Sequence, residues 1–304
     1  NLDPWKKWEL GGVENILKNY IELSEKCTQQ GAKLIIWPET ALPVYLLSGT
    51  YSDVVDSIYS FLRKNSVYLL TGMPDYIIHY NNPPEDAKLS KAGNFYYSTY
   101  NAILLFNPDS YEVQRYGKMQ LVPLGEKIPF ADALPFLADW FKWGVGLSGW
   151  NVGKDTTVFK FKIDNDTVKV AGLVCYESVF PDFVTNFTKK DAQFITVVTN
   201  DSWYGNSSGP YQHKEFAALR AVENRKAVVR CANGGISCLI NKFGITEYET
   251  SMFTRTSFVV DVPLNNKKTF YSEYPMIVPV LSSVFSIWII GINILIWIKR
   301  KFNT

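Results

Sequence analysis

The sequence is poor in histidine, which restricts the chemistry that it can support. Its 304 residues include two histidines, His79 and His213, which are more than a hundred positions apart. This count excludes a three-histidine metal site and leaves little room for metal chemistry based on imidazole. We expect both histidines to be structural or solvated, so any catalysis must depend on other side chains.

An excess of charge of one sign is also missing. Lys and Arg total 31 against 29 Asp and Glu, a net charge of +2. Non-specific nucleic-acid binding usually needs a much more basic surface, so nucleic acid is not an expected partner.

The four cysteines form no C-x-x-C pair and do not have the spacing of a disulfide framework, which argues against structural disulfides. Cys231 and Cys238 flank a turn and could approach each other in an oxidising compartment, but spacing alone does not establish a disulfide. Cys27 is expected in the core.

One long apolar run is present near the C-terminus. Residues 276–298 contain no ionisable side chain and are long enough to cross about 30 Å of hydrocarbon as a helix. A buried core helix is the alternative, but the few polar residues of this run make no polar face. The basic residues that follow predict a cytoplasmic tail at 299–304 and an outward-facing chain before the span.

The chain begins at Asn1 without an initiator Met or signal peptide. An outward-facing domain needs an upstream segment to carry it across the membrane. We therefore expect the natural precursor to have N-terminal membrane segments, and a start codon directly before Asn1 in the parent gene would contradict this.

The residues before the span alternate short apolar runs with amphipathic stretches, which is typical of a layered α/β domain, here placed at 1–270. β-branched and aromatic residues predict strands at 33–37, 67–71, 100–106, 158–163, 168–175, 194–199, 227–232, 236–240 and 258–262. Three- and four-residue spacing predicts helices at 13–27, 53–63 and 214–226.

An unusually aromatic stretch covers residues 130–150 and includes Trp140 and Trp143. Rings of this kind often lie at the headgroup level of a membrane, because they tolerate one wet and one apolar side. Filling of the protein core is an equally weighted interpretation.

Three chemically useful side chains follow apolar runs. Glu39 comes directly after a strand that Pro38 stops, Lys118 follows Gly117, and Cys175 is the last residue of a predicted strand. Chemistry in α/β folds is usually placed at strand ends. Each residue alone has a plain structural explanation: an inert buried thiol, a loop carboxylate or a surface cation.

Together these three side chains can make a nucleophile. A thiol with an ordinary pKa of about 8.5 is mostly protonated at neutral pH, and it needs a base or a cation to attack. Glu39 is the more plausible base, since neither histidine lies near these motifs. Lys118 can tune the glutamate and stabilise an oxyanion, which is worth about 3 kcal/mol per well-placed donor.

The motifs W-P-E-T, Y-G-K-x-x-L-V-P-x-G-E and V-C-Y-E-S-x-F-P occur in this order along the chain. They resemble those of the carbon–nitrogen hydrolase (nitrilase) superfamily, which uses a Glu-Lys-Cys triad. The segments T-A-L-P and T-N-D-S-W-Y-G, together with the C-terminal span, are more narrowly similar to the apolipoprotein N-acyltransferase family within it. The resemblance covers essentially the whole chain.

This resemblance implies a four-layer α-β-β-α sandwich followed by a transmembrane helix. It also implies that Cys175 is the nucleophile, Glu39 the general base and Lys118 the oxyanion-stabilising cation. Glu126 would support the triad, and Tyr176 and Glu177 would line the site beside the thiol. Further supporting or substrate-binding candidates are Asn200, Trp140 and Trp143.

The implied reaction is a ping-pong acyl transfer on the periplasmic face of the bacterial inner membrane. A phospholipid, typically phosphatidylethanolamine, would acylate Cys175 as a thioester. The acyl chain would then pass to the α-amino group of the S-diacylglyceryl cysteine at a lipoprotein's N-terminus. No metal or dissociable cofactor is implied. The family also carries membrane helices and a first strand upstream, and this chain has neither.

Two other functions stay open at this point. A membrane-tethered amidase or nitrilase would use the same triad to hydrolyse a small C–N substrate. A lipoprotein-binding module with an inactive triad is the third interpretation, which the intact Glu-Lys-Cys set makes less favourable. Lysophospholipid release and a thioester on Cys175 would support the transferase, whereas ammonia release from simple amides would support the hydrolase.

Overall fold

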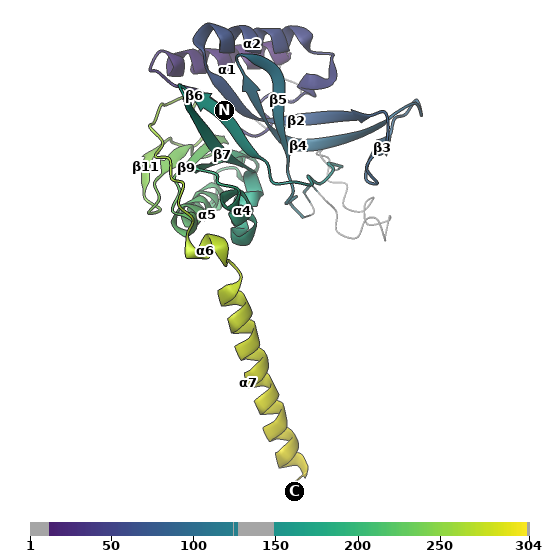
Figure 1. Ribbon diagram of the computed structural model, residues 1–304, viewed down its shortest axis with the longest axis vertical. Helices are drawn as coiled ribbons and strands as arrows, with labels where there is room; N and C mark the ends of the chain where they lie inside the picture. Colours follow the sequence, from purple (N-terminus) through teal and green to yellow (C-terminus); the bar gives the residue numbers. More distant parts are fainter. Residues whose placement is uncertain (1–11, 124, 127–148, 303–304) are drawn as a thin grey trace.

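A computed structural model describes residues 12–123, 125–126 and 149–302. Two β-sheets pack face to face, and helices cover the outer face of each sheet (Figure 1). The predicted four-layer α-β-β-α architecture is therefore confirmed.

The first sheet has five strands. Their order is β1 (Leu34–Trp37), β2 (Tyr68–His79), β4 (Tyr96–Asn107) and β3 (Lys88–Leu89), with β5 (Ser110–Gly117) also paired to β4. Strands β1 and β2 run parallel, and the other pairs are antiparallel.

The second sheet has six strands. Their order is β11 (Thr246–Glu249), β10 (Cys238–Ile240), β9 (Val228–Asn233), β8 (Phe194–Asn200), β7 (Asp166–Val174) and β6 (Val158–Ile163). The central strands β7, β8 and β9 run parallel, so their carboxyl ends meet at one edge of the sheet.

Helices α1 (Val13–Thr28) and α2 (Ser52–Asn65) cover the first sheet, and α4 (Pro181–Lys189) and α5 (Gly209–Asn224) cover the second. Three short 3₁₀ helices follow strands or loops: η1 (Leu46–Ser48), η2 (Cys175–Val179) and η3 (Asp201–Tyr204). Helix α6 (Phe270–Glu273) leads to the C-terminal helix α7 (Ile277–Phe302).

Alternation along the strands builds two apolar layers. In β4, Ile103 and Leu105 face the second sheet, whereas Leu104 and Phe106 face α1 and α2. Successive strand residues point to opposite faces, so a strand with apolar residues on both faces belongs in the middle of a layered structure. The sandwich is therefore built around strands that are apolar on both sides.

Eight of the nine predicted strands overlap observed strands, although β2 continues to His79, well beyond the predicted end at residue 71. All three predicted helices are present, although α5 begins at Gly209 rather than Lys214. Strand β7 ends at Val174, so Cys175 opens η2 instead of ending the strand as predicted.

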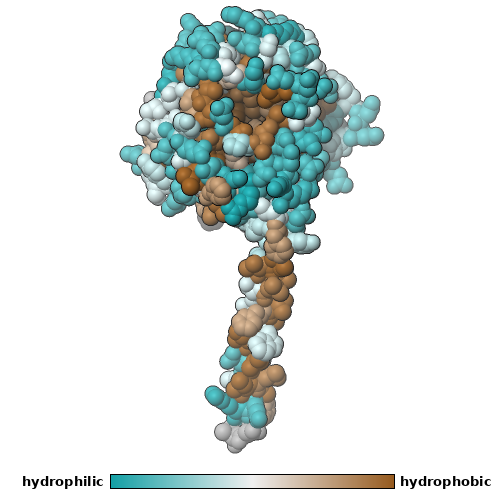
Figure 2. All heavy atoms as spheres, turned by 60° about the vertical axis from the view of Figure 1, so that its left-hand side comes forward, coloured by the Kyte–Doolittle hydropathy of each residue, from teal (hydrophilic) through white to brown (hydrophobic). Residues whose placement is uncertain are grey.

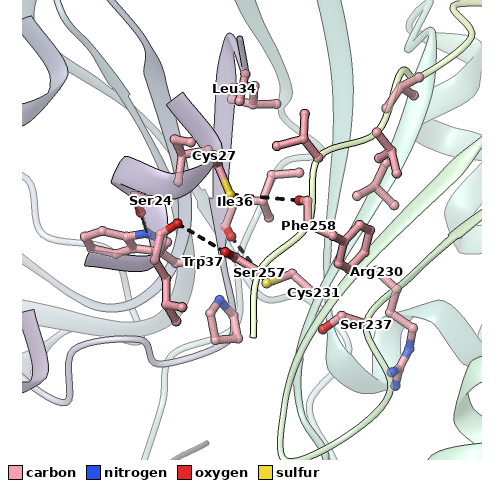
Figure 3. A pocket seen from close by; sticks show the side chains of 18 of the residues that line it. Ser24, Cys27, Leu34, Ile36, Trp37, Arg230, Cys231, Ser237, Ser257 and Phe258 are labelled. Carbon is pink, nitrogen blue, oxygen red and sulfur yellow. Dashed lines mark hydrogen bonds between the residues drawn. The ribbon is translucent and has the colours of Figure 1, made fainter. Parts of the chain in front are cut away.

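The prediction of a strand at 258–262 was wrong, because these residues lie in no helix or strand. A cavity of about 500 Å³ lies between this segment and β1. Figure 3 shows Leu34 and Ile36 of β1 with Ser257 and Phe258 across that cavity. A β-strand needs a ladder partner as well as suitable residues, and β1 pairs only with β2 in the described part of the chain.

The exposed helix α7 projects from the globular part, and apolar residues cover its surface (Figures 1 and 2). It has 26 residues, and its most apolar window has a mean hydropathy of 2.1 and is not buried. This helix is long and apolar enough to cross a membrane. It contains all of the predicted 276–298 span except Met276, and Lys299, Arg300 and Lys301 form its last turn.

Gly72 of β2 lies against the backbone of Pro38 and Glu39. A Cβ atom at Gly72 would lie 2.5 Å from the Glu39 Cα and 2.9 Å from the Pro38 carbonyl oxygen. The Ala41 N–H donates to the Gly72 carbonyl at 2.8 Å, which fixes the turn after Glu39. Only a residue without a side chain allows this approach.

We predict that Gly72→Ala destabilises the protein by about 1–3 kcal/mol, because the added methyl group overpacks a backbone contact. Thermal unfolding of the detergent-solubilised protein measures the effect. Gly291→Ala is the matched control, since nothing lies within 4 Å of a Cβ at that position. Equal melting temperatures for the two variants would contradict the prediction.

Candidate active site

Glu39 lies at the carboxyl end of β1, buried between the two sheets. Its side chain is 8% exposed. The Asn101 Nδ2 donates to Glu39 Oε1 at 2.7 Å, and the backbone N–H of Asn200 donates to Oε2 at 2.9 Å. Asn101 belongs to the first sheet and Asn200 to the second, so this carboxylate is held by both sheets.

Lys118 directly follows β5, and its ammonium joins two carboxylates. Its Nζ lies 2.7 Å from Glu126 Oε2 and 3.8 Å from Glu39 Oε1, and its side chain is 1% exposed. The Lys118 backbone N–H donates to the Asn101 carbonyl at 2.8 Å. The same Asn101 side chain donates to Glu126 Oε1 at 2.9 Å, so one amide bridges both carboxylates.

Cys175 begins the turn after β7 in an uncommon backbone conformation. Its φ of 51° lies in the left-handed region, which costs a non-glycine residue about 1–3 kcal/mol. The residue is buried, and the charges of Glu39 and Lys118 both act on its thiol. Glu39 and Lys118 lie 3.8 Å apart, and Cys175 is close enough for the charges of both to act on its thiol.

Burial controls the protonation of this cluster. It raises the pKa of the Cys175 thiol, the Glu39 carboxylate raises it further, and the Lys118 ammonium lowers it in part. Burial also raises the pKa of Glu39, partly offset by Lys118. For Lys118, burial lowers the pKa, but the charges of Glu39, Cys175 and Glu126 outweigh it and the net pKa is raised.

These shifts favour a neutral Cys175 thiol and a charged Lys118 ammonium in the cluster that also holds the Glu39 carboxyl group. Such a set can pass the thiol proton to Glu39 as sulfur attacks, while Lys118 faces the developing negative charge. The arrangement is suited to acyl transfer through a covalent intermediate. Within the described part of the chain, no three His, Cys, Asp or Glu side chains are grouped to hold a metal ion.

Glu177 is fully buried, and its hydrogen bonds stabilise the backbone around the site. Its Oε1 accepts from the Tyr116 hydroxyl at 2.6 Å and the Met119 N–H at 2.7 Å, and its Oε2 accepts from the Val174 N–H at 2.8 Å. These bonds connect the segment that carries Lys118 to the strand that precedes Cys175. Glu177 therefore stabilises the backbone around the site, whereas the sequence analysis expected its side chain to line the site.

The other predicted site residues have different surroundings. Tyr176 is half-buried and packs edge-on against Phe180, with ring centroids 5.1 Å apart. Asn200 contacts Glu39 through its backbone, while its side-chain Oδ1 accepts from Asn233 Nδ2 at 2.9 Å. Trp140 and Trp143 lie outside the described residues.

Asn101 is the main site residue that the sequence analysis missed. It stands in the apolar run at 100–106, where a lone amide among aliphatic residues is the one available signal. Nothing in that run indicates which distant residues the amide will contact. Its role becomes visible only when β4 is placed beside β2 and β5.

The four cysteines are free thiols, so Cys231 and Cys238 form no disulfide. Cys238 pairs with Arg230 in the sheet register. Neighbouring residues of a strand point to opposite faces, so Cys231 and Cys238 lie on opposite faces of the sheet. Cys27 is buried in the core as predicted.

We predict that alkylation of Cys175 by iodoacetamide in the free protein keeps accelerating above about pH 8.5, where an ordinary thiol levels off. Lys118→Met should slow alkylation at a fixed pH, because removing the ammonium raises the thiol pKa further. Peptide mass spectrometry measures the rate at Cys175. Exposed Lys64→Met is the matched control, and faster alkylation in Lys118→Met would contradict the prediction.

Comparison with known proteins identifies the family of this chain. A family model described as carbon-nitrogen hydrolase matches residues 4–268. The chain is 37% identical over 92% of its length to an apolipoprotein N-acyltransferase of Chlorobaculum tepidum, and the match covers 52% of that protein. It is 32% identical over its whole length to apolipoprotein N-acyltransferase 2 of Treponema denticola, covering 55%. The chain thus spans about half the length of these relatives.

A solved amidase from Nesterenkonia sp. has the same fold. Its TM-score is 0.53 at 16% identity, and the match covers 86% of this chain and 87% of the amidase. At this identity the likeness shows the fold alone. Together with the family model and the relatives, it leads to one conclusion: the chain belongs to the carbon-nitrogen hydrolase family.

Proposed function

We propose that this chain is the catalytic part of a membrane-bound apolipoprotein N-acyltransferase. It would move an acyl chain from a phospholipid, typically phosphatidylethanolamine, to the α-amino group of the S-diacylglyceryl cysteine of a lipoprotein. The similarity to N-acyltransferases along most of the chain supports this reaction. The observation that carries the proposal is the buried Lys118 between Glu39 and Glu126, with its charge acting on Cys175.

In the first half-reaction, the Cys175 sulfur attacks the carbonyl carbon of the sn-1 ester. Glu39 takes the thiol proton as the S–C bond forms, and Lys118 stabilises the oxyanion. When the ester C–O bond breaks, Glu39 returns the proton to the leaving oxygen. The products are a thioester on Cys175 and a lysophospholipid.

In the second half-reaction, the α-amino group of the acceptor attacks the thioester. Glu39 takes a proton from this amine, the C–S bond breaks, and the proton returns to the Cys175 thiolate. The product is an amide, and the enzyme is restored without any cofactor. The raised pKa of Glu39 is suited to a group that must bind and release a proton in each half-reaction.

Glu126 and Asn101 have supporting roles in this scheme. Glu126 contacts the side of the Lys118 ammonium at 2.7 Å, and its Oε2 also accepts from the Val122 N–H at 2.9 Å. Asn101 fixes both carboxylates relative to each other. We propose that Tyr176 lies beside the thiol and Asn200 beside the base, and that Glu177 stabilises the backbone around the site.

The helix α7 suits an enzyme whose two substrates are lipids. We propose that residues 276–298 span the bacterial inner membrane, that the tail at 299–304 is cytoplasmic, and that the domain at 1–270 faces the periplasm. The length and hydropathy of α7 support the span, and the basic last turn supports the orientation.

A hollow beside the site is suited to hydrocarbon. It measures about 620 Å³ and is lined by rings that include Tyr45, Tyr76, Tyr97 and Trp150. Its lining residue Pro74 pairs directly with Asn101 in the sheet, and Asn101 in turn contacts Glu39. We propose that the rings of this hollow help to keep water from a thioester. We propose Trp140 and Trp143 as further substrate-binding residues.

We predict that the protein purified from membranes carries one fatty acyl group on Cys175. Incubation with phosphatidylethanolamine should release lysophospholipid, and a diacylglyceryl peptide should then discharge the acyl group as an amide. Intact-protein and peptide mass spectrometry measure each step. Cys175→Ser should lower transfer by about 10⁴-fold or more.

Cys231→Ala is the matched control, because Cys231 lies outside the cluster and contacts the Ile36 carbonyl of β1. It should retain acyl transfer. Ammonia release from simple amides with no lipid turnover would contradict the transferase and support a membrane-tethered amidase. Unchanged transfer in the Cys175→Ser protein would support a binding module.

A further inference from the structure

A buried polar cluster lies directly behind the nucleophile, outside the catalytic set. His213 of α5 is 4% exposed, and its Nε2 lies 3.0 Å from the Cys175 carbonyl oxygen. Its Nδ1 lies 2.9 Å from Asp201 Oδ1. The histidine therefore connects the backbone of Cys175 to a buried carboxylate on the next strand end.

The hydrogen-bond partners of His213 determine which ring nitrogen donates to Cys175. A carbonyl oxygen only accepts hydrogen bonds, so the contact with Cys175 requires a proton on Nε2, which also lies 3.1 Å from the Ser178 hydroxyl oxygen. On the other side, Arg230 Nη2 lies 2.7 Å from Asp201 Oδ2 and 3.0 Å from His213 Nδ1. Burial tends to raise the pKa of Asp201, but His213 and Arg230 lower it overall, so Asp201 is a carboxylate that fixes the ring.

The bond to Cys175 acts on a turn that needs support. Cys175 has a φ of 51°, which a non-glycine residue keeps only when its surroundings fix it. The Ser178 hydroxyl also donates to the Cys175 carbonyl at 2.9 Å. From about two turns of α5 further along, Arg220 Nη1 donates to the Ser178 and Val179 carbonyls at 3.2 and 3.0 Å. Helix α5 thus fixes η2 at both of its ends.

We propose that His213 is a positioning residue for acyl transfer: its Nε2–H holds the Cys175 carbonyl, and thereby the left-handed turn that directs the sulfur toward Glu39 and Lys118. This proposal rests on the proposed function. His213 does not touch the reacting atoms, and its effect passes through the backbone of Cys175.

Two amide substitutions separate this role from general packing. His213→Gln places an N–H donor near the position of Nε2, whereas His213→Asn places its donor near Nδ1 and leaves the Cys175 carbonyl without it. We expect the Asn variant to lose about 10²-fold in the rate of thioester formation with phosphatidylethanolamine, with an unchanged KM, because a shift of about 1 Å in a reacting atom has an effect of this size. The Gln variant should stay within about tenfold of the parent protein.

Alkylation gives a readout that does not need the acyl-transfer reaction. In the Asn variant, the pH dependence of the rate at which iodoacetamide alkylates Cys175 should shift. The reason is that the charges of Lys118 and Glu39 act differently on a displaced sulfur. His79→Leu is the matched control, since its contact with Ser98 lies away from this cluster. Thermal unfolding of each detergent-solubilised variant reports the folded fraction, to which all rates are normalised.

The two proposals fail in different ways. If the parent protein forms no thioester, the proposed function fails, and the alkylation profiles still test positioning. Equal normalised alkylation profiles for the Gln, Asn and parent proteins would overturn the role of His213. Equal thioester rates for the Gln and Asn variants would overturn it as well.

Discussion

The site depends on one buried ammonium shared between two carboxylates. Lys118 is almost completely enclosed, with Glu126 at 2.7 Å and Glu39 at 3.8 Å. An isolated charge in such a place would be very unfavourable, and paired charges persist there only with good hydrogen bonding. Asn101 supplies it by donating to both carboxylates, so the cluster depends on how the strands of the first sheet are paired.

The fold brings these groups together from distant parts of the chain. Glu39 follows β1 and Lys118 follows β5 in the first sheet, while Cys175 follows β7 in the second. Face-to-face packing of the sheets sets the distance between them, and Gly72 lets β2 approach the turn after Glu39. Glu177 then fastens the Lys118 segment to the strand before Cys175. The catalytic geometry is therefore a property of the interface between two sheets.

Helix α5 links this interface to the segment that leads to the apolar helix. At its start, His213 contacts the nucleophile turn. At its end, the Glu223 carbonyl accepts from the Thr269 hydroxyl at 2.7 Å, and Lys226 Nζ donates to the Asn265 carbonyl at 2.6 Å. Burial lowers the pKa of Lys226 to about 8. One element thus contacts both the site and the connection to α7, which suits an enzyme that must hold its nucleophile at a defined place relative to a membrane.

The sequence by itself determined most strands and the apolar helix and singled out Glu39, Lys118 and Cys175 as candidates, because these depend on local periodicity and on residue types within short motifs. It did not predict that Glu177 is enclosed, that Asn101 bridges two carboxylates, or that His213 holds the Cys175 carbonyl. Each of these needs partners from other strands or helices, and no local pattern encodes them. Residues 258–262 show the same limit: their β propensity is high, but tertiary structure decides whether a strand has a neighbour to pair with.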